Sequence, residues 1–518
     1  MVTGNLREAA ETSTRYPLLR LFLLACAAVL AEGYHLGVDD GEIYVPAIKK
    51  VFDHRLYPFG AEFFLSHAHM SLFAPLVGDS ARLLHLPVET AILLWHVGCV
   101  FLILIAGWQL AQAFFTSARA HWGAVALLAA VLPVPVAGTA LVLSDNYLSA
   151  RSFSAPFALL SIGFLLRGRL RLAFLWLVLT ALFHPQMAVY CAAFLALYWY
   201  FDRISGDAAP VGSDALAGPA VAHRSAWLLA AVPSAGLLHS FSLTPATGAY
   251  RDVLYSRHYF FAYRWHWYEW IGAIAPLLLL AAIARWPPRA ASAAVARTCR
   301  ALILLAVFST AVFLLFSSSH RFDNLTRLQP MRSLHIVYLL MFVMLGGLLG
   351  EYVLRGRSWR WIALFLPLAL GMFAVDRGQY SSSPHIEWPW QAPSNPWLEA
   401  FAWARDHTPV DAVFALDPNY MAIRGEDTHG FRALADRSMI ADAYKDSGAV
   451  TMFPRLLDDW QQQQMMIAGW RSFGPADFER LAETSPATWV VIERKQQAGL
   501  DCPYSNAEVA VCRIAARP

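Results

Sequence analysis

Long apolar runs, separated by short polar connections, fill the first three quarters of the chain. They fall near residues 17–36, 87–115, 121–143, 153–167, 170–183, 187–201, 226–243, 270–285, 298–317, 333–353 and 360–375. A helix needs about 20 such residues to cross the hydrocarbon core of a bilayer, and somewhat fewer where its polar ends snorkel. The pattern therefore predicts an α-helical polytopic membrane protein with about 11 transmembrane helices.

Composition supports this class of protein. Only 15% of the 518 residues are charged and 57% are hydrophobic, whereas soluble domains are about 25% charged. The net charge of +3 is too small to indicate a nucleic-acid partner. The lipid bilayer is the first partner that the sequence indicates.

The short connections at 167–171, 285–300 and 355–360 contain arginine and no acid. By the positive-inside rule, all three face the cytoplasm. They share a side only if the run 170–201 crosses twice, with a turn at His184-Pro185, where proline interrupts helical hydrogen bonding. This reasoning predicts a cytoplasmic N-terminus and an extracytoplasmic C-terminal part.

The composition changes near residue 377. The stretch "SSSPHIEWPWQAPSNP" is typical of a linker, and the runs "AVFALD" and "TWVVIE" beyond it predict strands. Helices are predicted over "WLEAFAWARDH", "FPRLLDDWQQQQMMIAGW" and "PADFERLAE". We expect a transmembrane domain at 1–376 with a large first outer loop at 37–86, a linker at 377–395, and an extracytoplasmic α/β domain at 396–518.

Cys502 and Cys512 lie ten positions apart around the turn-rich "PYSNAE". This spacing suits a disulfide across a hairpin, which requires an oxidising compartment. Two unpaired thiols are the alternative that the spacing leaves open.

Three carboxylates, Asp39, Asp40 and Glu42, follow the first apolar run in "GVDDGEIYVPAIKKVF". A carboxylate at the centre of a membrane helix costs about 2.5–3.5 kcal/mol, so these acids must lie at or beyond the interface. The next residues alternate as in an amphipathic segment on the outer leaflet. Partial desolvation there would raise a carboxylate pKa and suit it to accept a proton from a hydroxyl. A solvated loop that only sets topology is the alternative.

Arginines gather in "RFDNLTRLQPMRS", where Arg321, Arg327 and Arg332 lie five or six positions apart. A guanidinium binds phosphate through two parallel hydrogen bonds and stays charged when partly buried. Arg327 and Arg332 are therefore candidates for holding a lipid phosphate. Ordinary snorkelling arginines at the interface are the alternative.

A second polar patch, "YRDVLYSRHYFFAYRWHWYEW" (250–270), places charged groups among ten aromatic residues. An aromatic belt with charged tips would explain it. The functional interpretation is a platform on which sugar rings stack, with Arg257 or His258 contacting phosphate.

Arg151 and His184 also border predicted helix ends. Arg151 is a candidate for phosphate binding, although an ion pair with Asp145 is the favoured interpretation. For His184, a capping or gap-filling role is favoured over binding. His67 and His69, with the acid pair Asp39 and Asp40, could supply oxygen and nitrogen ligands to a divalent metal. Because their spacing is loose, no metal ligand is assigned.

The order of these features resembles the GT-C class of glycosyltransferases, polytopic enzymes that use polyprenyl-phosphate-linked sugars. The likeness rests on a first helix, a long outer loop with "DDGEIY" near its start, and amphipathic outer helices. It implies that Asp39 or Asp40 is the catalytic base, with Glu42 a weaker candidate. It also implies inverting transfer of a sugar from a polyprenyl-phosphate donor to an unidentified acceptor, at the outer face of the bacterial cytoplasmic (inner) membrane. Members of the class divide between metal-dependent and metal-independent enzymes.

The chain is also similar to uncharacterised bacterial membrane proteins with "ARS", "HP" and "LQPxR" patches and a soluble C-terminal domain. Here these patches are residues 150–152, 184–185 and 328–332. This likeness indicates no activity, and a transporter, a flippase or a non-catalytic scaffold is the alternative to an enzyme. A transport path requires ionisable residues near helix midpoints. Here the polar groups are expected at one face, which favours the enzyme.

Overall fold

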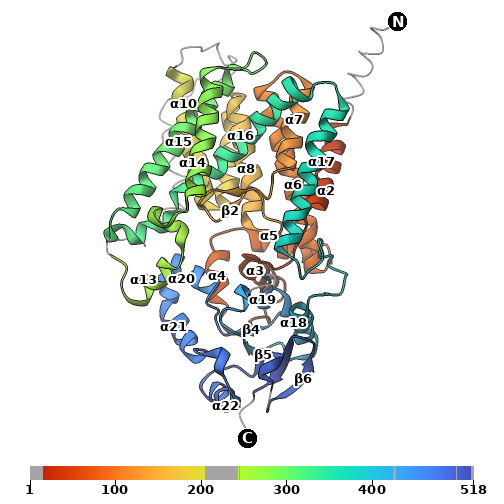
Figure 1. The fold of residues 1–518 in the computed structure, drawn as a ribbon, viewed down its shortest axis with the longest axis vertical. Helices are drawn as coiled ribbons and strands as arrows, with labels where there is room; N and C mark the ends of the chain where they lie inside the picture. Colours follow the sequence, from red (N-terminus) through yellow and green to blue (C-terminus); the bar gives the residue numbers. More distant parts are fainter. Residues whose placement is uncertain (1–15, 205–242, 244, 424–427, 498, 515–518) are drawn as a thin grey trace.

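The computed structural model describes residues 16–204, 243, 245–423, 428–497 and 499–514, and these form two layers (Figure 1). The upper layer in Figure 1 is a bundle of long helices, and the lower layer contains short helices and a sheet. The bundle helices are α2 (Pro17–Glu32), α6 (Val88–Phe114), α7 (Ala118–Ala129), α8 (Ala150–Leu166), α9 (Leu170–Phe183), α10 (Pro185–Ile204), α14 (Trp267–Arg285), α15 (Ala293–Ser317), α16 (Leu334–Leu348) and α17 (Ser358–Gln379).

The bundle belongs to a multi-pass membrane protein. Among the described residues, five helical segments are long and apolar enough to span a bilayer: 88–114, 267–285, 293–317, 320–354 and 358–379. α8 and α9 are shorter apolar helices. Ile362, Leu366 and Leu370 of α17 are 53–61% exposed, and lipid is the solvent in which such side chains are stable. The count of 11 spans stays a prediction, and the run 226–243 lies, apart from residue 243, outside the described residues.

The arginine-rich connections lie at one end of the bundle. Arg167 donates to the Gln109 carbonyl oxygen, and the Ser292 amide donates to the carbonyl oxygen of Phe114, 2.8 Å away. The Ala290 amide donates to the Tyr352 hydroxyl at 3.0 Å. These contacts put the three loops beside the same end of α6. The predicted break at His184-Pro185 is confirmed, because α9 ends at Phe183 and α10 begins at Pro185.

One predicted span is wrong in its second half. The apolar run 121–143 is helical only as far as Ala129, and the chain then forms a hairpin of β1 (Pro135–Val136) and β2 (Leu141–Val142). Gly138, at its turn, has φ +63°, and a Cβ there would lie 2.2 Å from the Trp265 ring. The hairpin is apolar because Val136, Leu141 and Leu143 are buried in protein. A buried hairpin and a lipid-facing helix give the same hydropathy signal.

Short helices cover the opposite end of the bundle. α3 (Gly41–Phe52), α4 (Glu62–Ala68) and α5 (Phe73–Leu83) follow the first helix, and α13 (Gly248–Tyr255) comes later in the chain. The amide of Leu72 donates to the Leu182 carbonyl oxygen at 2.9 Å, so this layer contacts the α9–α10 turn. In the C-terminal layer, α19 (Phe431–Ala435) packs against α3 and α20 (Asp446–Met452) packs against α4.

The C-terminal layer is built on a mixed five-stranded sheet of order β4-β3-β5-β7-β6. Its strands are β3 (Val413–Ala415), β4 (Ser438–Met439), β5 (Trp489–Glu493), β6 (Asp501–Ser505) and β7 (Val509–Arg513). β3 runs parallel to β4 and β5, with Phe414 opposite Trp489, whereas β7 is antiparallel to β5 and β6. Its helices are α18 (Pro396–His407), α19 (Phe431–Ala435), α20 (Asp446–Met452), α21 (Leu457–Met466) and α22 (Pro475–Thr484).

Local sequence explains these C-terminal elements. Asn395 accepts hydrogen bonds from the amides of Trp397 and Leu398 and so caps α18, with Pro396 at its first position. Alternate residues of β5 face the two sides of the sheet: Trp489 and Val491 pack toward α18, and Val490 and Ile492 pack toward α22. Cys502 and Cys512 form a disulfide between β6 and β7.

Candidate functional site

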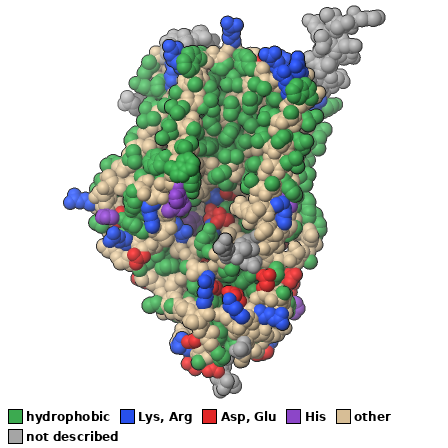
Figure 2. Space-filling model, viewed as in Figure 1, with side chains coloured by type: hydrophobic (Ala, Val, Ile, Leu, Met, Phe, Trp, Pro, Cys, Tyr) green, Lys and Arg blue, Asp and Glu red, His purple; other side chains and the backbone are tan. Residues whose placement is uncertain are grey.

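The acid pair of the first outer loop meets a lysine from the C-terminal layer. Lys445 Nζ donates to the carboxylates of both Asp39 and Asp40, and it lies 2.9 Å from Asp40 Oδ1. Asp39 has φ +49°, a conformation that Asp tolerates better than most residues, and its amide donates to the Thr428 carbonyl oxygen at 2.9 Å. Asp40 occupies the N-cap position of α3, but its side chain makes no capping hydrogen bond there. Figure 2 shows acidic, basic and histidine side chains around a hollow at this level, where the apolar helices meet the polar layer.

A second cation approaches the pair from the bundle. Arg151, in the first turn of α8, donates to Asp40 Oδ2 at 3.1 and 3.2 Å and to Asp145 Oδ2 at 2.9 Å. The Tyr147 hydroxyl lies 3.4 Å from Asp39 Oδ2 and from Arg151 Nη2. The favoured Arg151–Asp145 ion pair is therefore present, and Arg151 also bridges to the acid pair.

The two acids differ in their freedom to react. The Asp39 side chain is 44% exposed, whereas Asp40 is 30% exposed and accepts hydrogen bonds from both Lys445 and Arg151. Burial alone would raise the pKa of Asp40, but the charges of Lys445 and Arg151 outweigh it and hold that pKa well below its usual range. The expected rise in pKa is thus wrong for Asp40. Asp39 is the more accessible of the two carboxylates.

Glu42 has a different environment. It is fully buried and accepts hydrogen bonds from the amides of Arg432 and Ala433, at 3.2 and 3.0 Å, and from the Arg432 guanidinium at 3.3 Å. Arg432 in turn forms two hydrogen bonds to Asp446, at 3.0 and 2.7 Å. A Cβ at Gly430 would lie 2.1 Å from Glu42, so only glycine permits this close approach. Glu42 fixes the segment that carries Lys445 and has no open face toward a substrate.

The three arginines expected to hold phosphate occupy separate places. Arg257 donates to the Tyr444 carbonyl oxygen at 2.8 Å and to Ser447 Oγ at 2.5 Å, next to Lys445 in the chain. Arg327 is buried, with contacts to the carbonyl oxygens of Asn324 and Met452. Arg332 donates to Gln186 Oε1 at 3.3 Å. The Nε atoms of Arg257 and Arg332 are buried without a hydrogen-bond partner among the described residues.

Two of these arginines act electrostatically on groups that the acid pair also affects: Arg257 acts on Tyr444, and Arg332 acts on His67 and Tyr44. The charges of Asp40 and Arg332 both act on His67, whose pKa is lowered to about 4 chiefly by burial. Burial also raises the pKa of Tyr44 to about 12, and Arg151, Asp40 and Arg332 all act on that hydroxyl. Tyr44 on α3 and His67 on α4 are therefore within electrostatic range of both Asp40 and Arg332.

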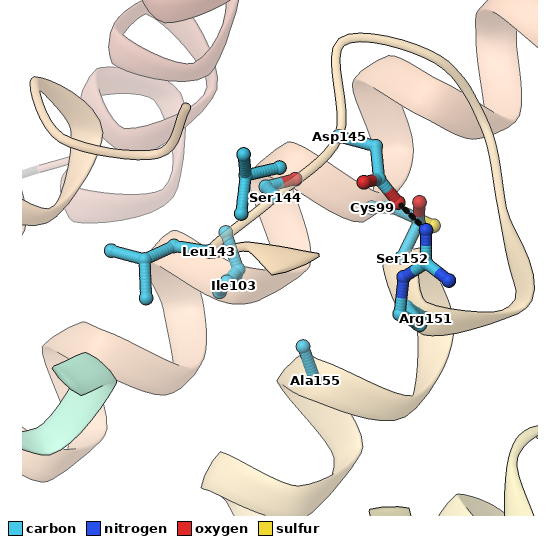
Figure 3. Close-up of a pocket in the computed structure, with 9 residues that line it drawn as sticks. Cys99, Ile103, Leu143, Ser144, Asp145, Arg151, Ser152 and Ala155 are labelled. Atoms are coloured by element: carbon cyan, nitrogen blue, oxygen red, sulfur yellow. Dashed lines mark hydrogen bonds and ion pairs between the residues drawn. The ribbon is translucent and has the colours of Figure 1, made fainter. Parts of the chain in front are cut away.

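Two small cavities lie near these residues. Arg151 and Asp145 line the first, together with Cys99, Ile103 and Ser152. The side chains of Arg151 and Asp145 point toward each other in Figure 3. Arg332 lines the second, with Gly138, Tyr259, Phe260, Thr326 and Gln329. Neither set of lining residues contains Asp39 or Asp40. Neither cavity therefore joins the acid pair to Arg332.

Two histidine candidates remain, and of these His184 lies within range of the charges of Arg151 and Arg332. His184 Nδ1 accepts a hydrogen bond from the Met187 amide at 3.4 Å, the capping role favoured from the sequence. His258 is 55% exposed and lies 3.6 Å from Glu269. Among the described residues, the set of His67, His69 and the acid pair does not converge as metal ligands. One other group does: His35, Glu387 and His429.

Sequence reasoning missed Lys445, Tyr147 and the Glu42–Arg432 contact. Lys445 is one of four lysines in a chain whose other basic residues are arginine, and it stands in the polar "ADAYKDSG". The rarity of lysine in this sequence could have marked Lys445 as a candidate site residue. Nothing in local pattern, however, pairs it with residues some 400 positions earlier.

No protein-family model and no curated protein matches this sequence. Among solved structures, the chain is similar to ArnT from Cupriavidus metallidurans bound to undecaprenyl phosphate. The identity is 13% and the TM-score is 0.30, over 98% of this chain and 100% of that chain. Because this similarity is low, the function has to be inferred from the residues of the chain itself.

Proposed function

We propose that the protein is an integral-membrane glycosyltransferase that moves a sugar from a polyprenyl-phosphate donor to an acceptor hydroxyl. One observation carries the proposal: Asp39, a half-exposed carboxylate, is held beside Lys445, Asp40 and Arg151 where the apolar helices end. The phosphate and sugar of a lipid-linked donor lie at this level of a bilayer, whereas its chain stays among the helices. We divide the chain into a membrane domain at 1–376, a linker at 377–395 and an α/β domain at 396–518 that covers the catalytic site.

Asp39 is the proposed general base. It takes the proton of the acceptor hydroxyl while that oxygen attacks the anomeric carbon from the side opposite the phosphate. The bond between the anomeric carbon and the phosphate oxygen breaks, its electrons stay on the phosphate, and the configuration inverts. Asp40 is held by Lys445 and Arg151 and so positions these cations.

Arg332 is the proposed phosphate ligand. Its Nε is buried without a hydrogen-bond partner among the described residues. Its charge acts on the side chains of Tyr44 and His67, which the charge of Asp40 also affects. A fixed guanidinium stabilises the negative charge that develops on the leaving phosphate. Arg257 is a second candidate because it lies beside Tyr444 and Lys445. We assign Arg327, which contacts the Met452 carbonyl oxygen, to docking of the C-terminal layer.

The side of the membrane follows from charge. The loops at 167–171, 285–300 and 355–360 lie at the end of the bundle away from the acid pair. The positive-inside rule puts that end in the cytoplasm, and the C-terminal layer then lies outside it. A disulfide between Cys502 and Cys512 is compatible with an extracytoplasmic position.

The test uses the purified full chain with a panel of polyprenyl-phosphate sugars and candidate acceptors, and release of polyprenyl phosphate is measured. We expect Asp39→Asn to reduce release by about 100-fold or more, because a general base is lost. The control is Asp79→Asn, which changes an exposed acid paired with Arg82 on α5 and should keep wild-type activity. Equal release by wild type and Asp39→Asn, or none from any donor, would contradict the proposal.

A further inference from the structure

Three segments far apart in the sequence run side by side just before the acid pair. Tyr34 pairs with the segment at 385–387: its amide donates to the His385 carbonyl oxygen at 3.1 Å, and the Glu387 amide donates to the Tyr34 carbonyl oxygen at 2.9 Å. On the other side, the Gly430 amide donates to the Gly37 carbonyl oxygen at 2.9 Å. The pairing is parallel with the first segment and antiparallel with the second.

Each of these segments contributes one side chain to a common point. His35 Nδ1 lies 3.0 Å from Glu387 Oε1, and His429 Nε2 lies 2.6 Å from the same oxygen. The three atoms all lie within 4.8 Å of one another. The side chains of His35, His429 and Glu387 are 0%, 1% and 11% exposed.

Neighbouring groups fix the direction of these atoms. His35 Nε2 contacts Asp376 Oδ1 at 3.0 Å, which leaves Nδ1 facing Glu387. Glu387 Oε2 accepts the Leu36 amide at 2.8 Å, which leaves Oε1 facing both imidazoles. A carboxylate on the far nitrogen of an imidazole is the usual support of a metal-bound histidine. His429 Nδ1 has no hydrogen-bond partner among the described residues, so these neighbours do not satisfy this buried ring.

We propose that His35, Glu387 and His429 bind one divalent transition-metal ion of the Zn²⁺ class. Two imidazole nitrogens and one carboxylate oxygen suit Zn²⁺ and disfavour Mg²⁺ and Ca²⁺, which take oxygen ligands. In the alternative arrangement the two imidazoles are protonated, pair with the carboxylates and bind no metal. Metal content distinguishes this arrangement from the metal site.

The proposed ion has a structural role that does not depend on the reaction catalysed. It ties the end of α2, the linker and the C-terminal layer at one point. Asp39 follows His35 by four positions, and its amide bonds to Thr428, the residue before His429. A bound metal ion would therefore keep the acid pair close to Lys445. The ion itself would not contact a substrate.

Metal content of the purified full chain, measured by elemental analysis after dialysis, tests the proposal. We expect about one zinc per chain in the wild type, and a loss of most of it in His429→Gln and Glu387→Gln. Glutamine at 387 can still accept the Leu36 amide, so this variant keeps the local fold. The matched control is His385→Gln. His385 contacts the same Asp376, at 2.6 Å, but lies outside the ligand set and should leave the metal bound.

A second measurement needs no variant. Wild-type protein stripped with a chelator should lose thermal stability, and Zn²⁺ should restore it, because a ligand that binds only the folded state raises Tm. Co²⁺ at the same site should give visible absorption bands of a low-coordinate complex. The proposal is overturned if stripped wild type shows no Tm response to Zn²⁺ or Co²⁺, or if His385→Gln loses as much metal as His429→Gln. Failure of the sugar-transfer assay would leave these readouts unaffected.

Discussion

Lys445 Nζ lies 2.9 Å from Asp40 Oδ1, although 405 positions separate the two residues, and the same ammonium contacts Asp39. This contact joins the first outer loop to the C-terminal layer across the candidate site. Its strength comes from partial burial: Lys445 is 11% exposed, so the ion pair is screened by water less than a surface pair is. The position of the acid pair therefore depends on the docking of the C-terminal layer.

Lys445→Met should lower both stability and activity. The substitution keeps the length of the side chain but leaves Asp39 without its cation and Asp40 with Arg151 alone. We expect a loss of about 2 kcal/mol, between the values for exposed and fully buried pairs, and at least a tenfold fall in polyprenyl-phosphate release. Thermal unfolding and the release assay measure the two effects. Lys495→Met, which removes a 73% exposed lysine, is the control; comparable losses in the two variants would contradict the interpretation.

Arg432→Leu should destabilise the protein more than a substitution at the exposed site residue Asp39. It leaves Glu42 and Asp446 buried without their shared cation, and removing one partner from such a network costs about 3–5 kcal/mol. Chemical or thermal unfolding of the solubilised protein measures this loss. Arg480→Leu, which breaks an exposed pair with Asp477, should leave Tm nearly unchanged. A wild-type Tm for Arg432→Leu would show that the network adds little to stability.

Much of the architecture could be predicted from sequence because it depends on local pattern. Apolar runs indicated the long helices, and proline after His184 indicated the break between α9 and α10. The acid pair was found from its position after the first helix. Its partners were not, because Lys445 and Arg151 come from segments that only the folded chain brings together. Glu42 was the weaker candidate for the base, and nothing in the local pattern showed that α3 directs its side chain into the core.

His67 should make stability depend on pH between about 6.5 and 4. Burial lowers its pKa to about 4, so the unfolded chain binds a proton in this range that the folded chain does not. Stability is therefore lost as pH falls from 6.5 toward 4. We expect His67→Gln to show a smaller fall in Tm over this range than the wild type. His69→Gln, at the exposed neighbouring position, should follow the wild type. A wild-type slope for His67→Gln would exclude this residue as a source of the pH dependence.

Arg332→Gln should weaken use of the lipid donor more than it weakens folding. The guanidinium lies at a cavity and has only Gln186 as a hydrogen-bond acceptor among the described residues, so few structural contacts are lost. A charge-assisted hydrogen bond to phosphate is worth about 1.5–3 kcal/mol, which predicts a fall in kcat/KM of about tenfold to 100-fold. The release assay at varied donor concentration measures it. Arg321→Gln, an exposed arginine in the same segment, is the matched control. If both variants lose activity equally, the effect belongs to surface charge and not to a phosphate contact at Arg332.

The disulfide between Cys502 and Cys512 should stabilise the edge of the C-terminal sheet. It closes a loop of ten residues, and chain entropy alone then predicts about 2–3 kcal/mol of stabilisation. The Cys502→Ser/Cys512→Ser variant should unfold at a lower temperature, whereas Cys26→Ser, which changes an unpaired cysteine in α2, should not. Mass analysis after alkylation, with and without reductant, shows whether the two thiols are protected in protein isolated from membranes. Full alkylation without reductant would place this face of the protein in a reducing compartment, and it would reverse the sidedness derived from the arginine-rich loops.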